Sequence, residues 1–193
     1  MIRLLVIFIL MTLHCPIWAV PARLPLCASC HGMDGKSLQS IWPNLAGQSQ
    51  KYMAEQLSLY KNKKRPSDIM QNFAALLTDK DIEELSAYYS QSPNRSPPVE
   101  KNPLQKAGEN LYKLGDYKRK LPACSACHGP LGRGNDPAKY PGIAKQNREY
   151  FIQQLYAFKN HQRKTDPMSV MQDISARLSA DDMQVLAEYI QTL

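Results

Sequence analysis

Apolar and polar positions along the chain recur at intervals of three and four residues, which is the spacing of one helix face. Two sets of positions follow it clearly: Tyr52, Gln56, Leu57 and Tyr60, and Tyr150, Gln154, Leu155 and Phe158. No stretch alternates convincingly with the period of two that a half-buried strand requires. The pattern therefore predicts an all-α protein with almost no sheet.

Further along each half, a second helix pattern begins at its own start signal. Thr78 with Asp81, and Ser179 with Asp182, form capping boxes in which Asp replaces the usual Glu. Apolar stripes follow these signals: Ile82, Leu85, Tyr88 and Tyr89, and Met183, Leu186, Tyr189 and Ile190. We expect Pro- and Gly-containing loops between the helices of each half.

The two halves are copies of one unit. Cys27-Ala28-Ser29-Cys30-His31-Gly32 recurs as Cys124-Ser125-Ala126-Cys127-His128-Gly129 at an offset of 97. An offset of 98 pairs Tyr52 with Tyr150, Gln56 with Gln154, Leu57 with Leu155 and Arg65 with Arg163, and after a three-residue slip Met70 meets Met171. We therefore predict two domains, residues 20–92 and 104–193, joined by a Pro-rich linker over residues 93–103.

The amino terminus has the pattern of a secretory signal peptide over residues 1–19. Arg3 gives a positive start, and the apolar run from Leu4 to Leu13 is too short to span a bilayer comfortably. Cleavage after Ala19 would remove Cys15 and leave four of the five cysteines. The alternative is an uncleaved anchor over residues 4–20. The bulky His14 disfavours a lipoprotein signal at Cys15.

Cys-x-x-Cys-His, present once in each half, is the attachment signature of c-type haem. Positions i, i+3 and i+4 share a helix face, so two thiols can form thioethers while the imidazole reaches the iron. A zinc site would need four ligands, and each half repeats only two cysteines and one motif histidine. A thioredoxin-like pair would need a βαβ context, and a disulfide would leave the histidines without a role. We expect two covalently bound haems, held by Cys27 and Cys30, and by Cys124 and Cys127. A cofactor would also complete the core of units this small.

His31 and His128 are the predicted proximal iron ligands, and the sixth ligand decides whether the iron is closed. Met70 and Met171 are the candidates, because each precedes a leucine of its half, Leu77 or Leu178, by seven residues. Met70 lies in a stretch that we expect to be a loop before the last helix. Met53 and Met183 fit core positions, and Met168 is the alternative to Met171.

Pro43 follows His31 by 12 residues, and Pro141 follows His128 by 13. A backbone carbonyl at these positions could accept the second ring N–H of the histidine and fix its orientation. An ordinary turn proline explains the spacing equally well.

These motifs together resemble the dihaem cytochrome c4 family, two class I cytochrome c domains in tandem. The matching segments are residues 42–48, 122–129, 154–155, 171–174 and 187–190, and the resemblance covers nearly the whole chain after residue 19. It implies His–Met ligation by His31 with Met70 and by His128 with Met171, and hydrogen bonds to the carbonyls of Pro43 and Pro141. It also implies a periplasmic electron carrier between the quinol-oxidising cytochrome bc complex and terminal oxidases.

One departure concerns the helix that precedes the haem motif in class I domains. The second unit has a candidate over residues 104–114, whereas the first unit has only residues 20–26, with prolines at 21 and 25. These residues leave no room for such a helix, so the first domain is either trimmed and leans on its neighbour or the cleavage site lies elsewhere. A trimmed domain should be the less stable half.

Two function classes remain. An electron carrier needs no open iron position, whereas a peroxidase, a thiosulfate-oxidising cytochrome or the haem subunit of sulfide-oxidising flavocytochrome c would favour one. The only further histidine after residue 19 is His161, in a basic run where we expect it to be solvated. The carrier is therefore favoured, with the flavocytochrome subunit as the alternative.

The formal net charge is +7. The basic runs at residues 61–65 and 118–120 could meet an acidic redox partner or anionic lipid, which would give a loose membrane association. Each run taken alone is more simply a solvated helix end or loop. Nucleic acid is not indicated, because no recognised binding motif is present.

Overall fold

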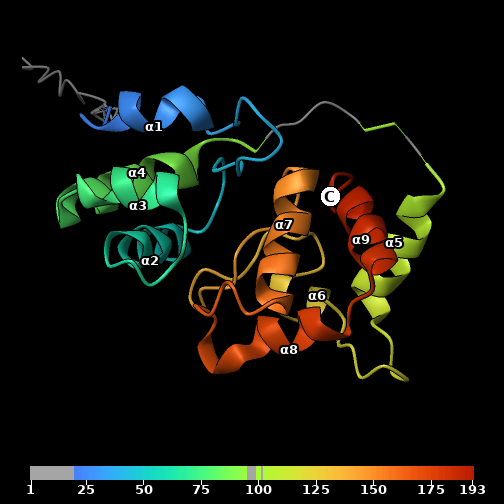
Figure 1. Cartoon of the computed structure of the whole chain (residues 1–193). Helices are drawn as coiled ribbons and strands as arrows, with labels where there is room; N and C mark the ends of the chain where they lie inside the picture. Colours follow the sequence, from blue (N-terminus) through green and yellow to red (C-terminus); the bar gives the residue numbers. More distant parts are fainter. Residues whose placement is uncertain (1–19, 95–98, 101) are drawn as a thin grey trace, which may run out of the picture.

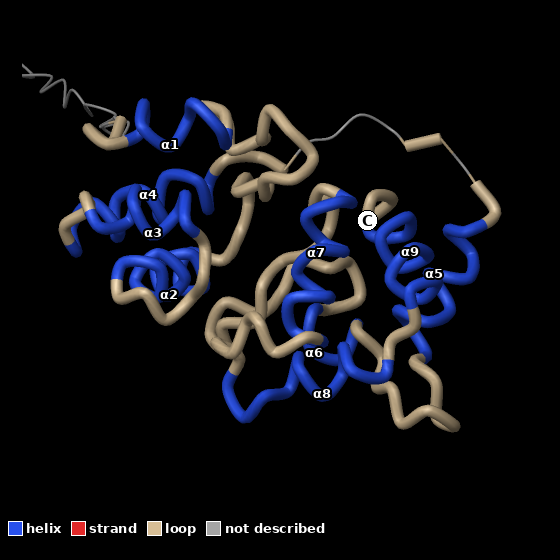
Figure 2. The backbone as a smooth tube through the Cα atoms, in the orientation of Figure 1, coloured by secondary structure: helices blue, strands red, loops and turns tan. Residues whose placement is uncertain are grey.

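The computed structural model describes residues 20–94, 99–100 and 102–193, so the predicted signal segment lies outside the described residues. Within those ranges the helices, in chain order, are α1 (Leu24–His31), α2 (Gln50–Lys61), α3 (Asp68–Ala75), α4 (Asp79–Gln91), α5 (Leu104–Leu114), α6 (Ser125–His128), α7 (Arg148–Lys159), the 3-10 turn η1 (Pro167–Ser169), α8 (Val170–Arg177) and α9 (Ala180–Ile190). Figure 2 shows helices joined by long loops and no strand in the described part. The all-α prediction is confirmed.

The helices form two groups, α1–α4 and α5–α9, that follow the sequence repeat (Figure 1). In the first group α2 packs against α3 and α4, and in the second α7 packs against α8 and α9. Both predicted capping boxes are present. In each one the N-cap hydroxyl accepts from the N3 backbone N–H, and the N3 aspartate accepts from the N-cap backbone.

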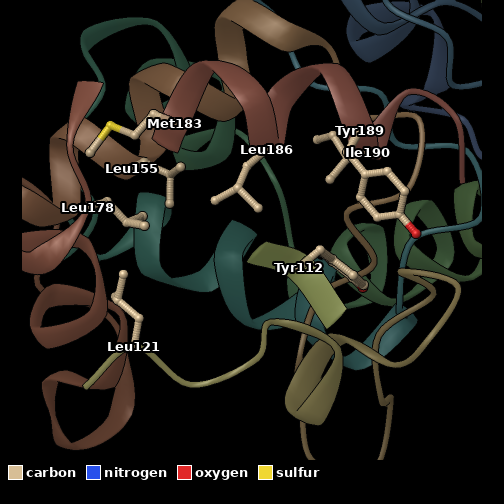
Figure 3. Close-up of a cluster of buried hydrophobic side chains, with 8 residues drawn as sticks. All are labelled: Tyr112, Leu121, Leu155, Leu178, Met183, Leu186, Tyr189 and Ile190. Atoms are coloured by element: carbon tan, nitrogen blue, oxygen red, sulfur yellow. The ribbon is translucent and has the colours of Figure 1, made fainter. Parts of the chain in front are cut away.

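Each group has its own apolar core. The first contains Leu24, Met53, Leu77, Ile82, Leu85 and Tyr89. The second contains Tyr112, Leu121, Leu155, Leu178, Met183, Leu186, Tyr189 and Ile190 (Figure 3). The predicted apolar stripes of α4 and α9 supply much of both clusters, and Met53 and Met183 are core residues as expected.

Among residues 20–94, 99–100 and 102–193, a separate helix that precedes the motif occurs only in the second group, where α5 packs closely on α9. Gly108 permits the approach: a Cβ there would lie 2.0 Å from the carbonyl oxygen of Val185. In the first group, α1 begins at Leu24 and continues through the motif itself, so residues 20–26 hold no separate preceding helix, as expected. Pro25 lies in the first helical turn, where its missing N–H costs no hydrogen bond.

A tyrosine on the last helix of the first group makes the contact that a tyrosine on α5 makes in the second. In the second group the hydroxyl of Tyr112, on α5, donates to the carbonyl of Gly129, 2.6 Å away. In the first group the hydroxyl of Tyr89, on the last helix, donates to the equivalent carbonyl of Gly32 at 3.1 Å. Both tyrosines are buried. The loop that follows each haem motif is therefore fastened to the core from a different helix.

The expected loop around Met70 is wrong, because Met70 lies in helix α3 and Met171 lies in the corresponding helix α8. Each helix has only eight residues, too few for the apolar spacing to be evident. Ser67 caps α3, and its hydroxyl accepts from the backbone N–H of Met70 at 3.2 Å.

Candidate haem sites

The four motif cysteines lie on the two helices that begin each site. Cys27 and Cys30 belong to α1, Cys124 is the N-cap residue of α6, and Cys127 lies within α6. All four are free and half-buried. Burial raises the pKa of the Cys27 and Cys124 thiols to about 11. At neutral pH both groups are therefore protonated thiols.

Each motif histidine is oriented by a backbone carbonyl. Nδ1 of His31 lies 3.0 Å from the carbonyl oxygen of Pro43, and Nδ1 of His128 lies 2.9 Å from that of Pro141. A carbonyl only accepts, so Nδ1 carries the proton and donates it. Nε2 is then the free lone pair, which is the arrangement of a metal-ligating histidine.

The electrostatics of the two imidazoles favour the same state. Burial lowers the pKa of His31 and of His128 below its ordinary value, and the hydrogen bond to the proline carbonyl acts more weakly in the opposite direction. Burial disfavours the charged form because a low-dielectric surrounding solvates it poorly. Both imidazoles are consequently neutral, as iron binding requires.

The methionines differ sharply in exposure. Met70 and Met171 are half-buried, and Met171 packs against the second apolar cluster. Met168, the alternative to Met171, is 89% exposed. Its backbone φ is +53°, in the left-handed region, and the following Ser169 has φ +56°.

A polar network that the sequence analysis did not anticipate joins the two groups. Arg65 donates to Gln56 of its own group at 2.8 Å, and to Tyr150 and Gln154 of the other at 2.9 and 2.8 Å. Arg163 reciprocates: it donates to Gln154 at 2.7 Å, and across to Tyr52 and Gln56 at 2.8 and 3.1 Å. Each of these residues has an identical counterpart 98 positions away in the sequence. This identity was the sequence signal that could have pointed to the network.

A second reciprocal pair extends this interface. The side chain of Gln48 donates to the carbonyl of Gly142 and accepts from its N–H, both at 2.8 Å. Gln146, its repeat partner, accepts from the N–H of Asn44 at 2.7 Å and donates to its carbonyl at 3.0 Å. Both glutamines are buried, so these bonds form away from competing water.

The residues fit a haem in each group. Arg65 and Arg163 are only 4% and 7% exposed, yet in the described part of the chain neither forms an ion pair, and their partners are hydroxyl and amide oxygens. A buried cation without a countercharge is costly. The propionates of haem would supply negative charge, the four thiols would supply the thioether sulfurs, and the neutral imidazoles would supply the iron ligands.

The arginines correct one expectation about the surface. The basic run at residues 61–65 was expected to be solvated, but its last member, Arg65, is buried in the interface; Arg163 lies likewise in the run around His161. His161 itself is exposed, as expected. Among the described residues no helix is long and apolar enough to cross a membrane.

Comparison with known proteins gives a consistent result. The cytochrome c family model matches residues 25–92 and 105–193. The chain is 38% identical to cytochrome c4 of Thiocapsa roseopersicina over 169 residues, 87% of each chain. It is 34% identical to a thiosulfate dehydrogenase electron acceptor of Stutzerimonas stutzeri, covering 84% of this chain and 76% of that protein. The crystal structure of reduced recombinant cytochrome c4 from Pseudomonas stutzeri superposes with a TM-score of 0.83 at 34% identity, covering 89% of this chain and 95% of that one.

The two attachment motifs, the two helical domains and the matches over most of the chain support a single conclusion. The chain belongs to the cytochrome c family and is a dihaem c-type cytochrome of the cytochrome c4 group, an electron-transfer protein with two covalently bound haems.

Proposed function

We propose that this cytochrome carries single electrons between redox partners in the periplasm through two haems, each ligated by histidine and methionine. The residues assigned to the first haem are Cys27, Cys30, His31, Met70 and Pro43, and those assigned to the second are Cys124, Cys127, His128, Met171 and Pro141. The observation that carries the proposal is the pair of hydrogen bonds from the histidine Nδ1 to the proline carbonyl, present in both copies.

The chain's contribution to electron transfer is to keep each iron environment fixed. When bound, each haem supplies an iron that takes up or releases one electron. The proline carbonyl holds the imidazole ring, burial keeps it neutral, and a methionine as the further ligand would leave no position for a substrate. A site that changes little on reduction suits outer-sphere transfer.

The structure favours Met171 over Met168 as the second methionine ligand. Met171 packs against the core of its domain, whereas Met168 is 89% exposed. An exposed thioether would have to abandon its solvated position to reach a buried iron.

Localisation and domain boundaries form part of the same proposal. The amino-terminal pattern supports export with residues 1–19 as the signal. The two segments matched by the family model support domains at residues 20–92 and 104–193 with a linker at 93–103. We propose the cytochrome bc complex as electron donor and a terminal oxidase as acceptor, with loose membrane contact through basic surface residues.

A second candidate is a haem protein that serves one enzyme, either as its acceptor or as its subunit. The observation behind it is the 34% identity to a thiosulfate dehydrogenase electron acceptor. A flavin that co-purifies with the chain, or reduction by sulfide alone, would favour the subunit. Reduction by thiosulfate only when a thiosulfate dehydrogenase is added would favour the acceptor.

The ligand assignment is tested by removing each methionine and measuring whether a haem then binds carbon monoxide. Met70→Ala and Met171→Ala should each let one of the two reduced haems bind carbon monoxide, while the wild type binds none. Met168→Ala is the matched control and should leave both haems closed. If Met168→Ala opens a haem and Met171→Ala does not, the second assignment is wrong.

A further inference from the structure

The turn that leads into α8 is organised by one carboxylate. Asp166 accepts hydrogen bonds from the backbone N–H of Met171 at 2.7 Å and of Gln172 at 3.1 Å, and from the side-chain amide of Gln172 at 2.9 Å. Three donors therefore converge on the aspartate, and one of them belongs to the proposed axial ligand.

In the first domain the side chain that caps the equivalent helix is a neutral hydroxyl, and the nearby Asp68, in the first turn of α3, is exposed. There the hydroxyl of Ser67 accepts from the backbone N–H of Met70 at 3.2 Å. The backbone N–H of Gln71, which follows Met70, donates to the carbonyl of Ser67 at 2.9 Å, and its side chain donates to the carbonyl of Arg65. The two sites thus differ by a full negative charge hydrogen-bonded to the backbone of the methionine.

The capping residue lies farther from the methionine along the chain in the second domain than in the first. Ser67 precedes Met70 by three residues, whereas Asp166 precedes Met171 by five. The intervening Met168 and Ser169 both have left-handed backbone conformations, which are unfavourable for residues other than glycine. They turn the chain so that the carboxylate reaches back to the start of α8.

A further hydrogen bond holds the side chain of Gln172, which donates to Asp166. Gln172 is 6% exposed, and its carbonyl oxygen lies 2.9 Å from Nδ1 of His161. A buried amide held at both ends fixes the position of the carboxylate to which it donates.

We propose that Asp166 is a positioning residue for Met171 and that its charge lowers the reduction potential of the second haem. The inference rests on the proposed role of Met171 as an iron ligand. Reduction adds one electron to the iron and removes one unit of positive charge from the site. A nearby negative charge stabilises the oxidised form, and in a partly buried site solvent screens that interaction incompletely.

The test is a potentiometric titration of the dihaem protein at neutral pH. Asp166→Asn should shift the reduction equilibrium constant of one haem about tenfold toward the reduced form. For one electron, this corresponds to a reduction potential about 59 mV higher. Ser67→Asp should lower the potential of the other haem, and Asp166→Glu should keep the wild-type value. Asp173→Asn is the matched control, since it removes an exposed charge from the first turn of the same helix.

The outcomes separate charge, structure and ligand assignment. If Asp166→Asn leaves both potentials unchanged, or shifts them no more than Asp173→Asn does, the proposal is overturned. It is also overturned if Asp166→Glu shifts the potential as far as Asp166→Asn does, because the charge is then not the cause. If Met171→Ala fails to open an iron to carbon monoxide, the ligand assignment itself fails, whatever the Asp166 variants show.

Discussion

At the scale of single residues, the two motif histidines combine a hydrogen bond with burial. The bond to the proline carbonyl fixes the tautomer, and burial keeps the ring uncharged. Either effect alone would leave the iron with a ligand that is misoriented or partly protonated. Because the carbonyl belongs to the backbone, its position depends on the loop and not on a side chain.

At the scale of elements, the second domain depends on close contact between α5 and α9. Gly108→Ala places a methyl group against the backbone of Val185, so the two helices must separate. We expect this to destabilise the second domain by about 1–3 kcal/mol, measured as earlier loss of one haem's methionine ligation during urea unfolding. Asn110→Ala, at an exposed position of the same helix, should change stability by less than about 0.5 kcal/mol.

The equivalent carbonyls of Gly32 and Gly129 accept from tyrosines on different helices, Tyr89 and Tyr112, which gives a second prediction at this scale. Tyr89→Phe removes the hydrogen bond from its hydroxyl to the Gly32 carbonyl. It should cost about 1 kcal/mol or more and affect the first haem, whereas Tyr112→Phe should affect the second. Tyr117→Phe, at a residue 97% exposed, is the control. Equal effects of the first two variants on both haems would show that neither tyrosine acts within its own domain.

At the scale of the whole molecule, the two domains share a buried polar interface. Burial raises the pKa of Tyr52, but the positive charges of Arg163 and Arg65 outweigh it, so that the pKa lies below its ordinary value. Each arginine spans both domains, so removal of one disrupts bonds on both sides. The trimmed first domain can therefore lean on the second, which was one of the two possibilities that the sequence left open.

Arg163→Gln should weaken this coupling. We expect a loss of about 3 kcal/mol, because Tyr52 and Gln56 lose a charged donor in a buried site. In urea followed by haem absorbance, the first domain should then lose methionine ligation before the second, with a wider separation than in the wild type. Arg133→Gln, at an exposed arginine, should leave the separation unchanged. Simultaneous loss in both the wild type and Arg163→Gln would contradict both the coupling and the lower stability of the first domain.

Much of the fold could be predicted from local pattern. The helix positions follow from apolar spacing, and the capping boxes from the short range of side-chain to backbone bonds. The haem motif is equally local, since three residues on one helical turn carry it. The helix around Met70 was missed because eight residues give too few repeats of the spacing.

The sequence by itself determined the repeat, the two attachment motifs and the helical class, because each depends on residues near one another along the chain. Only the tertiary structure decided what the identical polar pairs at the 98-residue offset do. Arg65 and Arg163, read as parts of a repeated unit, meet across the interface and serve each other's domain. A sequence repeat shows that two residues are equivalent. It does not show whether each residue forms hydrogen bonds within its own copy or with the other copy. That choice depends on how the copies pack, because a buried guanidinium must find acceptors wherever the packing brings them within reach.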